Sequence, residues 1–433
     1  MYLNLKLFIK MIWWRCNMTL NLQKITKNSR IAFDSKVNTT NKNRVLKKFS
    51  SLLKKNKKKI IKENHKDIKF AKKKKLKENL IKRLEIDEKK INNIIKSINQ
   101  IIRIKDPTNQ ILEKWKRPNG LILKKVTVPI GVIAVIYESR PNVTSDIASL
   151  CFKSGNAVVL RGGSEAFNTN KIISNLFRLS LKNCGVDQNY VQFINSKNRK
   201  IVDKLLSTMK GYIDLIVPRG GKSLVKKVDE LSRVPYIGHL EGICHTYIDK
   251  KAQLKMAIKV LENAKMRNTS ICGATETVLF HESIAKKFVN PVLENLQKKG
   301  CNIFADKTIK KLFDGKSNLA NNKSWSTEYL SSNISAKVVK NLNEAVKHIN
   351  QFGTMHTDAI ITDDKKAADY FLKNIKSSIG IHNSSTQFAD GGEFGFGAEV
   401  GISTNNLPPR GPVGLGQLVS YKYEVYGKGQ IRK

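Results

Sequence analysis

Cys272 lies in a polar loop whose composition suits a nucleophilic thiol. The segment 263–280, NAKMRNTSICGATETVLF, places this cysteine just before an expected strand. A loop thiol is accessible, and nearby Lys265 and Arg267 could lower its pKa toward the reactive thiolate. Taken singly, a cysteine is more often a small buried hydrophobic residue, and three others fit that description because they stand beside apolar residues: Cys151, Cys184 and Cys301. Cys272 is therefore the candidate nucleophile.

Three histidines could serve Cys272 as a base and make the protein a Cys–His hydrolase: His239, His281 and His356. Spacing alone places none of them within hydrogen-bonding reach of the thiol. His239 also stands near Cys244 and His245, but the last two are adjacent in an expected strand and should face opposite sides. We therefore expect no metal site.

Two glycine-rich turns follow expected strands and could hold phosphate groups. The first turn is Arg161, Gly162, Gly163 and Ser164, and the second runs from Pro218 and Arg219 through Gly220, Gly221, Lys222 and Ser223. Glycines let backbone amides approach a phosphate at the positive end of a helix. Neither turn matches GxGxxG, so an ordinary tight strand-to-helix turn explains each equally well. Two such loops on neighbouring strands would suit a dinucleotide, and their basic residues favour a 2′-phosphorylated cofactor.

The elements that must position these residues alternate between short strands and helical stretches from about Leu121 onward. Seven segments are typical of buried strands: 131–136, 156–160, 190–194, 212–217, 244–248, 276–280 and 358–362. The helix-length segments between them predict an α/β fold with parallel sheets and right-handed crossovers. Residues 112–129 differ, because 118–120 supply a turn between two extended arms. We expect a hairpin standing off the sheet, whose small core favours pairing with a second subunit.

The chain of 433 residues is folded but strongly basic. Its 79 Lys and Arg against 35 Asp and Glu leave a net charge of +44, while 40% of residues are hydrophobic. Length alone suggests about three structural units at ~150 residues each. Much of the charge lies in 47–105, where apolar residues recur at helical spacing, so amphipathic helices with solvated lysine faces are predicted. Blocks of lysine contact the phosphates of a nucleic acid without regard to its base sequence. Aromatic residues that could stack on bases are scarce in 47–105, so we expect no specific nucleic-acid partner.

Other classes of protein are excluded by the cysteine and apolar patterns. The six cysteines form no CxxC pair, which argues against a zinc ribbon or a disulfide framework and favours the cytoplasm. The longest apolar stretch falls short of the ~18 residues of a membrane helix. Residues 1–17 lack the apolar core of a signal peptide, and we expect them to be an extension that precedes a second start at Met18.

Six blocks of the sequence, in order, resemble the γ-glutamyl phosphate reductases. This family, also called glutamate-5-semialdehyde dehydrogenases, belongs to proline biosynthesis and to the aldehyde dehydrogenase superfamily. The blocks are 128–170, 218–225, the Cys272 segment, WSTEYL at 325–330, HTDAI at 356–360 and QFADGGEFGFGAEVGIST at 387–404. The resemblance runs from about Met18 to Tyr426.

The resemblance implies an aldehyde-dehydrogenase-like α/β fold with separate cofactor and catalytic domains. A Rossmann-like cofactor domain is expected at 18–240 with the hairpin arm 112–129, a catalytic domain at 241–390, and a return to the cofactor domain with an oligomerisation tail at 391–433. The implied activity is NADPH-dependent reduction of L-glutamyl 5-phosphate to L-glutamate 5-semialdehyde with release of phosphate. The resemblance also implies that the chain forms a homo-oligomer. It further implies functional coupling to a glutamate 5-kinase.

The resemblance also implies roles for single residues. Cys272 matches the catalytic cysteine, and Arg161–Ser164 with Gly220–Ser223 match the cofactor loops. Glu328 in WSTEYL resembles the glutamate that holds the nicotinamide ribose. Asn142, with the backbone amide of Cys272, is the expected donor to the oxyanion of the tetrahedral species.

One departure from the wider superfamily concerns the base that activates water. Aldehyde oxidisers carry a glutamate there, whereas this chain has His239. A reductase that passes its thioester to hydride needs no such base, so His239 is expected to contact phosphate or to act structurally. Arg219, Ser384 and Ser385 are the expected partners of the substrate's α-amino and α-carboxylate groups. The alternative interpretations are that the chain is a related aldehyde dehydrogenase or a basic nucleic-acid-binding protein.

Overall fold

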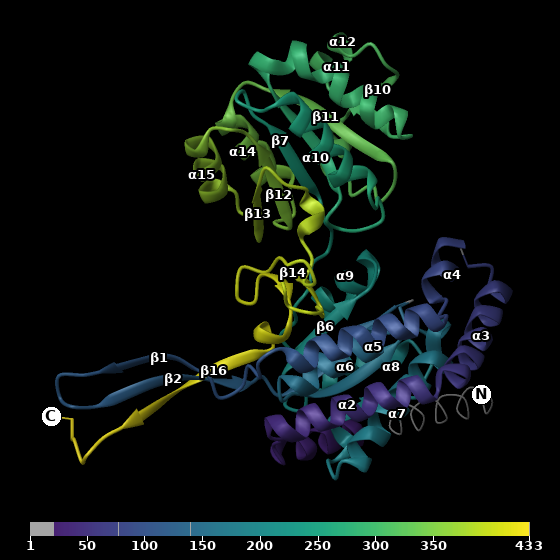
Figure 1. The fold of residues 1–433 in the computed structure, drawn as a ribbon, viewed down its shortest axis with the longest axis vertical. Helices are drawn as coiled ribbons and strands as arrows, with labels where there is room; N and C mark the ends of the chain where they lie inside the picture. Colours follow the sequence, from purple (N-terminus) through teal and green to yellow (C-terminus); the bar gives the residue numbers. More distant parts are fainter. Residues whose placement is uncertain (1–20, 77, 139, 433) are drawn as a thin grey trace, which may run out of the picture. The chain divides into compact units, whose positions relative to one another are not determined.

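The computed structural model describes residues 21–76, 78–138 and 140–432, which Figure 1 shows as a ribbon. The chain divides into two compact units, and each is described by itself. Unit 1 holds the described residues up to Gly238, with Gly395–Gly401 and the described residues from Val413 onward; unit 2 holds His239–Phe394 and Ile402–Pro412. The predicted extension at 1–17 lies outside the described residues. The functions expected of the two domains stay predictions.

Unit 1 is built around a four-stranded parallel sheet with the strand order β5-β4-β3-β6. The strands are β3 (Val132–Tyr137), β4 (Ala157–Gly162), β5 (Val191–Phe193) and β6 (Leu215–Arg219). The crossover helices are α6 (Asn142–Lys153), α7 (Phe167–Asn183) and α8 (Lys200–Thr208), and α9 (Lys222–Leu231) follows β6. All side chains of β3 and β4 are buried, as in parallel sheets covered by helices. The four strands expected here are confirmed.

The lysine-rich segment forms amphipathic helices, as predicted. They are α2 (Thr39–Lys55), α3 (Lys57–Lys73), α4 (Glu78–Leu84) and α5 (Glu88–Arg103), and residues 21–34 are helical as well. Helix α5 buries Ile91, Ile94, Ile98 and Ile101 along one face. The spacing of these residues places them on one stripe, so the lysines of the other face remain in solvent.

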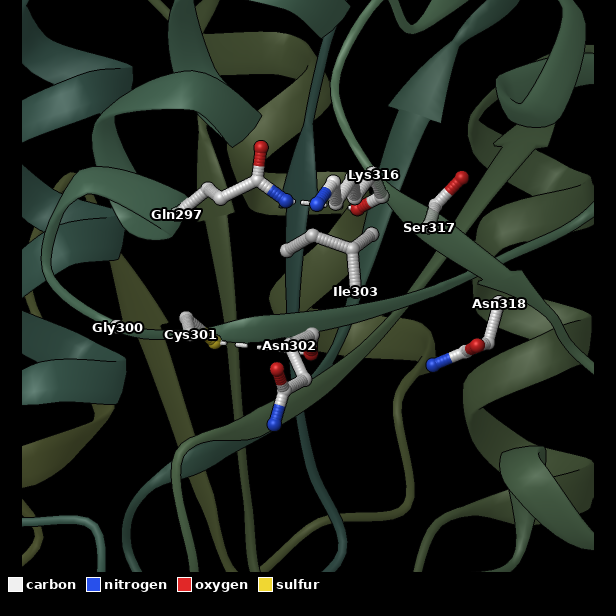
Figure 2. A pocket seen from close by; sticks show the side chains of 8 residues that line it. All are labelled: Gln297, Gly300, Cys301, Asn302, Ile303, Lys316, Ser317 and Asn318. Carbon is white, nitrogen blue, oxygen red and sulfur yellow. Dashed lines mark hydrogen bonds between the residues drawn. The ribbon is translucent and has the colours of Figure 1, made fainter.

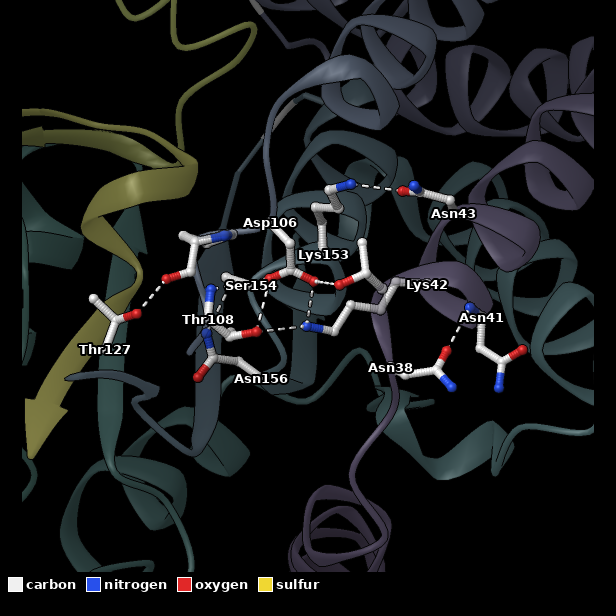
Figure 3. A network of polar contacts seen from close by, with 12 residues as sticks. Asn38, Asn41, Lys42, Asn43, Asp106, Thr108, Thr127, Lys153, Ser154 and Asn156 are labelled. Carbon is white, nitrogen blue, oxygen red and sulfur yellow. Dashed lines mark hydrogen bonds and ion pairs between the residues drawn. The ribbon is translucent and has the colours of Figure 1, made fainter. Parts of the chain in front are cut away.

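Lys42 is an exception, because α2 buries it in an ion pair with Asp106, just beyond α5 (Figure 3). The Lys42 Nζ lies 2.9 Å from Asp106 Oδ2 and donates to Thr108 Oγ1 at 3.2 Å. The Thr108 backbone amide donates to Asp106 Oδ1 at 3.0 Å. Burial alone would raise the pKa of Asp106, but these hydrogen bonds and the lysine charge outweigh it and lower the pKa. The pair ties the helical layer to the chain that enters the hairpin.

Replacing Lys42 with Met should destabilise the protein by about 3 to 5 kcal/mol, because one buried charge then loses its partner. Urea unfolding followed by circular dichroism measures the change, and Lys48→Met on the exposed face of the same helix is the matched control. The folded pKa of Asp106 is depressed, so its stabilisation is present above the unfolded value of about 3.9 and is lost as pH falls through the folded value. Equal stability of the two variants would contradict a stabilising role for the pair.

The predicted hairpin is confirmed, and it is part of a three-stranded antiparallel sheet. Strands β1 (Ile111–Lys116) and β2 (Ile122–Pro129) form the hairpin, and β16 (Val419–Tyr426) pairs with the other edge of β2. Large apolar side chains on the outer strands are about half exposed: Ile111, Leu112, Tyr421, Tyr423, Val425 and Tyr426. The sheet therefore has two open edges and an apolar surface.

Unit 2 contains a seven-stranded parallel sheet with the order β10-β9-β11-β8-β7-β12-β13. Its strands are β7 (Cys244–Ile248), β8 (Thr275–His281), β9 (Asn302–Ala305), β10 (Ser317–Leu319), β11 (Asn333–Val339), β12 (Thr357–Ile361) and β13 (Ile379–His382). The three strands predicted in this unit are confirmed as β7, β8 and β12. The others escaped prediction because they are short or, like β11 with Lys337, interrupted by polar residues.

Helices connect these strands: α10 (Leu254–Met266), α11 (Glu282–Lys298), α12 (Lys307–Leu312), α13 (Asn322–Trp325), α14 (Leu342–Phe352) and α15 (Lys365–Asn374). Two short strands near the end of the chain, β14 (Gly401–Ser403) and β15 (Gly411–Val413), pair with each other. None of the helices in the described part of the chain combines the length and apolar character that a bilayer crossing requires.

Candidate active site

The loop that carries Cys272 connects α10 to the amino end of β8 in unit 2. His356 directly precedes β12, and β7 lies between β8 and β12 in the sheet. The strands are parallel, so residues just before β8 and β12 meet at one edge of the sheet. His239 opens unit 2 a few residues before β7. The topology thus gathers one cysteine and two histidines that are far apart in the sequence.

Cys272, His239 and His356 form a compact cluster. One nitrogen of each histidine and the Cys272 sulfur all lie within 4.8 Å of one another. The two imidazole rings meet edge to face with their centroids 5.0 Å apart. His239 Nδ1 is hydrogen-bonded to the carbonyl of Ile402 at 2.9 Å, and His356 Nδ1 to the hydroxyl of Thr357 at 2.9 Å. Because each Nδ1 is engaged, Nε2 is the nitrogen left to face the thiol.

The two histidines make Cys272 acidic. Burial alone would raise the pKa of its thiol, but the charge of His356 and a hydrogen bond from His239 outweigh burial and hold the pKa well below its usual range. A thiolate with a cationic neighbour is the reactive form of cysteine. The prediction that Lys265 and Arg267 lower this pKa is wrong: the Lys265 ammonium is buried against Glu276, and Arg267 donates to the Gln387 side chain at 2.8 Å.

Two other cysteines of unit 2 are held as thiols. The Cys244 Sγ donates to the backbone carbonyl of Cys272 at 3.1 Å, and burial raises its pKa well above the usual value. Cys301 lines a cavity of about 420 Å³ beside β9 and β10, where burial raises its pKa to about 12 (Figure 2). That cavity therefore holds no activated nucleophile among its described lining residues, and the reactive thiol of this unit is Cys272.

His281 is separated from Cys272 by the full length of β8, because it is the last residue of that strand. Its side chain accepts a hydrogen bond from the Ser283 amide at 3.1 Å and caps α11. Of the three histidines weighed as partners of the thiol, the structure selects His239 and His356. No local signal could have made that choice, since it depends on the strand order.

Glu328 lies near the loop that carries Cys272. Gly242 contacts both, because it donates to Glu328 and packs against Cys272. The Glu328 Oε1 accepts a hydrogen bond from the Gly242 amide at 2.8 Å, and burial raises the pKa of this glutamate. A Cβ atom at Gly242 would lie 2.2 Å from the Cys272 carbonyl oxygen, so only glycine allows this approach. Two residues further along, the Leu330 amide donates to Glu276 Oε1 at 3.2 Å. The Glu328 carboxylate is thus positioned by the Gly242 amide, while its contact with a ribose stays a prediction.

The two glycine-rich turns of unit 1 lie at the carboxyl ends of β4 and β6. Tyr137, the last residue of β3, pairs in register with Gly162 on one side and with Arg219 on the other. The expectation that the turns follow neighbouring strands is therefore wrong, because β3 separates β4 from β6. Strand order reverses direction at β3, and such a switch point is where open α/β sheets bind nucleotides.

The glycine at 162 is required by the chain's own packing. A Cβ there would lie 2.2 Å from Nδ2 of the buried Asn170, and one at Gly220 would lie 2.6 Å from Oε2 of the exposed Glu138. The Gly221 amide, just before α9, donates to the same Glu138 oxygen at 3.1 Å. Sequence reasoning missed Glu138, whose carboxylate at a switch point could accept a ribose hydroxyl.

Arg161 carries the clearest sign of a ligand at this edge of unit 1. Its side chain is buried, its Nη2 reaches the Asn198 carbonyl at 3.4 Å, and its Nε has no hydrogen-bond partner among the described residues. An unpartnered buried guanidinium nitrogen is costly, which fits a site that receives an anion. The residues present therefore fit a dinucleotide, although the roles of the two turns stay predictions.

The residues expected to bind substrate are distributed over both units. Asn142 is the first residue of α6 and donates to Asp146 Oδ2 at 3.1 Å. Arg219 lies 3.8 Å from Glu399. Ser385 is buried, and its hydroxyl accepts from the Gln387 amide at 3.2 Å, so a structural role accounts for it; Ser384 is half-buried in the same turn. The expected roles of these residues stay predictions.

The chain is similar to known proteins over most of its length. The family model for the aldehyde dehydrogenase family matches residues 18–303. The gamma-glutamyl phosphate reductase of Bartonella quintana is 47% identical over 353 residues, which is 82% of this chain and 85% of that protein. The enzyme of the same name from Rhodospirillum rubrum is 48% identical over 353 residues, or 82% of each chain. The crystal structure of gamma-glutamyl phosphate reductase from Thermotoga maritima superposes with a TM-score of 0.92 at 38% identity, covering 95% of this chain and 100% of that one.

Proposed function

Because the chain belongs to the γ-glutamyl phosphate reductases of the aldehyde dehydrogenase family, we propose that Cys272 is the residue on which it reduces L-glutamyl 5-phosphate to L-glutamate 5-semialdehyde in proline biosynthesis. The observation that carries this assignment is the acidic thiol held between His239 and His356. A thiolate is a strong nucleophile, and an acyl phosphate is a carbonyl with a good leaving group.

The reaction starts with attack of the Cys272 sulfur on the acyl carbonyl. The C–S bond forms, the C–O bond to phosphate breaks, and a thioester remains on the enzyme. The His239 and His356 side chains can donate hydrogen bonds to the departing phosphate, whose negative charge grows as the bond breaks. A bound nicotinamide cofactor supplies hydride. When the aldehyde leaves, the sulfur recovers its electron pair and the two histidines again stabilise the thiolate.

The family uses nicotinamide cofactors, and NADPH is the proposed donor. Support comes from the basic residues at both turns of unit 1, since Arg161 has an unpartnered buried nitrogen and Lys222 opens α9. Arg161–Ser164 and Gly220–Ser223 are the proposed binding loops. A guanidinium or ammonium group suits a 2′-phosphate, whereas a carboxylate is the typical partner of the free 2′-hydroxyl of NAD.

His239 supports reduction over aldehyde oxidation. Its Nδ1 donates to the Ile402 carbonyl, and its hydrogen bond and charge lower the pKa of Cys272, so the side chain stabilises the thiolate. A group that does not remove a proton from water leaves the thioester for hydride. The related aldehyde dehydrogenase weighed as an alternative would need that base.

The reverse reaction tests the assignment. With glutamate 5-semialdehyde and NADP⁺, we expect NADPH absorbance to rise only when inorganic phosphate is present, because phosphate must accept the acyl group from the cysteine. Arsenate in place of phosphate is the positive control for an anion acceptor, and sulfate is the matched negative control. Turnover at the same rate without phosphate would instead indicate a hydrolytic aldehyde dehydrogenase.

A homo-oligomer is proposed from the three-stranded sheet of unit 1. Its outer strands β1 and β16 have open edges and carry six half-exposed large apolar side chains, which would be stabilised by burial against a second copy. Sedimentation velocity at micromolar concentration should show a species larger than a monomer. Tyr423→Lys on the exposed face should shift it toward the monomer, whereas Lys422→Arg should not. A monomeric wild type would contradict the proposal.

The substrate also suggests a functional partner. An acyl phosphate hydrolyses readily, so a glutamate 5-kinase that makes it is the proposed upstream enzyme. The lysine-rich helices need no separate function, because their basic residues form the solvated faces of amphipathic helices.

A further inference from the structure

The cluster around Cys272 has the ligand chemistry of a zinc site. Zn²⁺ prefers cysteine thiolate and neutral histidine nitrogen, and protein sites with three such ligands keep a fourth position open for water or substrate. His239, Cys272 and His356 offer one sulfur and two nitrogens within 4.8 Å of one another. Tetrahedral zinc, with bonds of about 2.0 to 2.3 Å, needs ligand separations of about 3.5 Å. Side-chain movements of about 1 Å would bring the sulfur and the two nitrogens to this separation.

The hydrogen bonds of the two histidines match those of metal ligands. A histidine that binds metal through one nitrogen usually donates its other N–H to an oxygen, which fixes the ring. His239 Nδ1 is bonded to the Ile402 carbonyl and His356 Nδ1 to the Thr357 hydroxyl, each at 2.9 Å. In both residues Nε2 is therefore the nitrogen on the side of the Cys272 sulfur, where an ion would bind.

His356 supplies an independent observation. Its side chain is fully buried, and its Nε2 has no hydrogen-bond partner among the described residues. A buried nitrogen without a partner costs free energy, which a ligand at this position would recover. The other buried histidines with such a nitrogen, His245 and His348, have no cysteine in their group.

We propose that Cys272, His239 and His356 bind Zn²⁺ and that the ion inhibits the enzyme. Binding is not a redox step: the sulfur is already a thiolate and donates an electron pair to the ion, and each histidine releases its Nε2 proton to solvent and donates the electron pair left on that nitrogen. The electron pair that attacks the acyl carbonyl is then held in the Zn–S bond, so the nucleophile is removed while the ion stays. Removal of the ion by a chelator restores the thiolate.

The site is tested by binding to the full-length protein, independently of activity. Zn²⁺ titrated against a chromophoric chelator should show one ion per chain with a dissociation constant of about 1 μM or below. Co²⁺ should give a thiolate-to-metal charge-transfer band that is absent in Cys272→Ser. The double variant His239→Asn, His356→Asn should bind more than about 100-fold more weakly, because two of three ligands are lost. Cys301→Ser and His281→Asn are matched controls that should bind as wild type.

Two results would overturn the proposal. One is a wild-type chain that binds zinc no more tightly than the Cys272→Ser variant. The other is a double histidine variant, shown to be folded by circular dichroism, whose affinity stays within about threefold of wild type, because the sulfur alone would then hold the ion. Neither result bears on the phosphate-dependent reaction, so the two proposals fail separately.

Discussion

Cys272→Ala is expected to abolish reduction of L-glutamyl 5-phosphate, with kcat lowered by about 10⁴-fold or more. The substitution removes the only atom proposed to form a bond to the acyl group, and no neighbouring thiol can replace it. The Cys244 sulfur is near, yet burial raises its pKa well above the usual value and its S–H is directed to the Cys272 carbonyl. NADPH consumption measures the loss, and quenching of protein fluorescence by NADPH should be unchanged.

Cys244→Ala is the matched control, because it removes a thiol of the same pair of strands without touching the nucleophile. It should keep activity within about threefold of wild type, since it loses only two weak contacts of the sulfur, with the Cys272 carbonyl and with His356 Nδ1. Mass spectrometry after rapid quenching should place the glutamyl group on Cys272. Equal loss of activity in the two variants, or an acyl group on any other side chain, would contradict the assignment.

His356→Asn is expected to lower activity by about 10² to 10³-fold at neutral pH by removing thiolate. The charge of His356 is the largest of the effects that lower the pKa of Cys272, so its loss should move the pKa upward. In wild type the Cys272 thiolate persists well below pH 8.5, the usual pKa of a cysteine. In the variant the pKa of Cys272 is higher, so the thiolate should already be lost at a higher pH. Each unit of upward shift lowers the thiolate fraction tenfold at a pH below both values.

Alkylation of Cys272 by iodoacetamide measures this shift directly. The rate should be followed from pH 5 to 9 in the presence of a chelator, with the modified residue identified by peptide mapping. His239→Asn should show the same direction of change through loss of its hydrogen bond, whereas His281→Asn, at the far end of β8, should follow the wild-type profile. A superimposable profile for His356→Asn would show that this histidine does not control the thiol.

The activity of His356→Asn at high pH separates two roles of this side chain, stabilisation of the thiolate and donation to the departing phosphate. If His356 acts only by stabilising the thiolate, raising the pH should restore much of the activity of His356→Asn. If the side chain also donates to the departing phosphate, a loss will remain at high pH. The unpartnered Nε2 of His356 favours the second outcome, because this atom is free to donate when phosphate is present.

The sequence by itself determined many of the elements and singled out the candidate nucleophile. The strand at 131–136 is a continuous apolar run, and the lysine-rich helices repeat apolar residues at helical spacing, so short-range patterns suffice to predict them. Cys272 stood out through its polar loop and through the order of six blocks that resemble one family. These signals are local, or depend only on order along the chain.

Only the tertiary structure decided which side chains meet. His356 lies 84 residues beyond Cys272 and reaches it because β7 separates β8 from β12 in the sheet. The strand order also placed β3 between the two glycine-rich turns, and it paired β16 with a hairpin almost 300 residues earlier. Lys265 and Arg267 are close to Cys272 in sequence, yet Lys265 forms an ion pair with Glu276 and Arg267 donates to the Gln387 side chain. Spacing along a chain limits which residues can be near, whereas the pairing of strands fixes which ones touch.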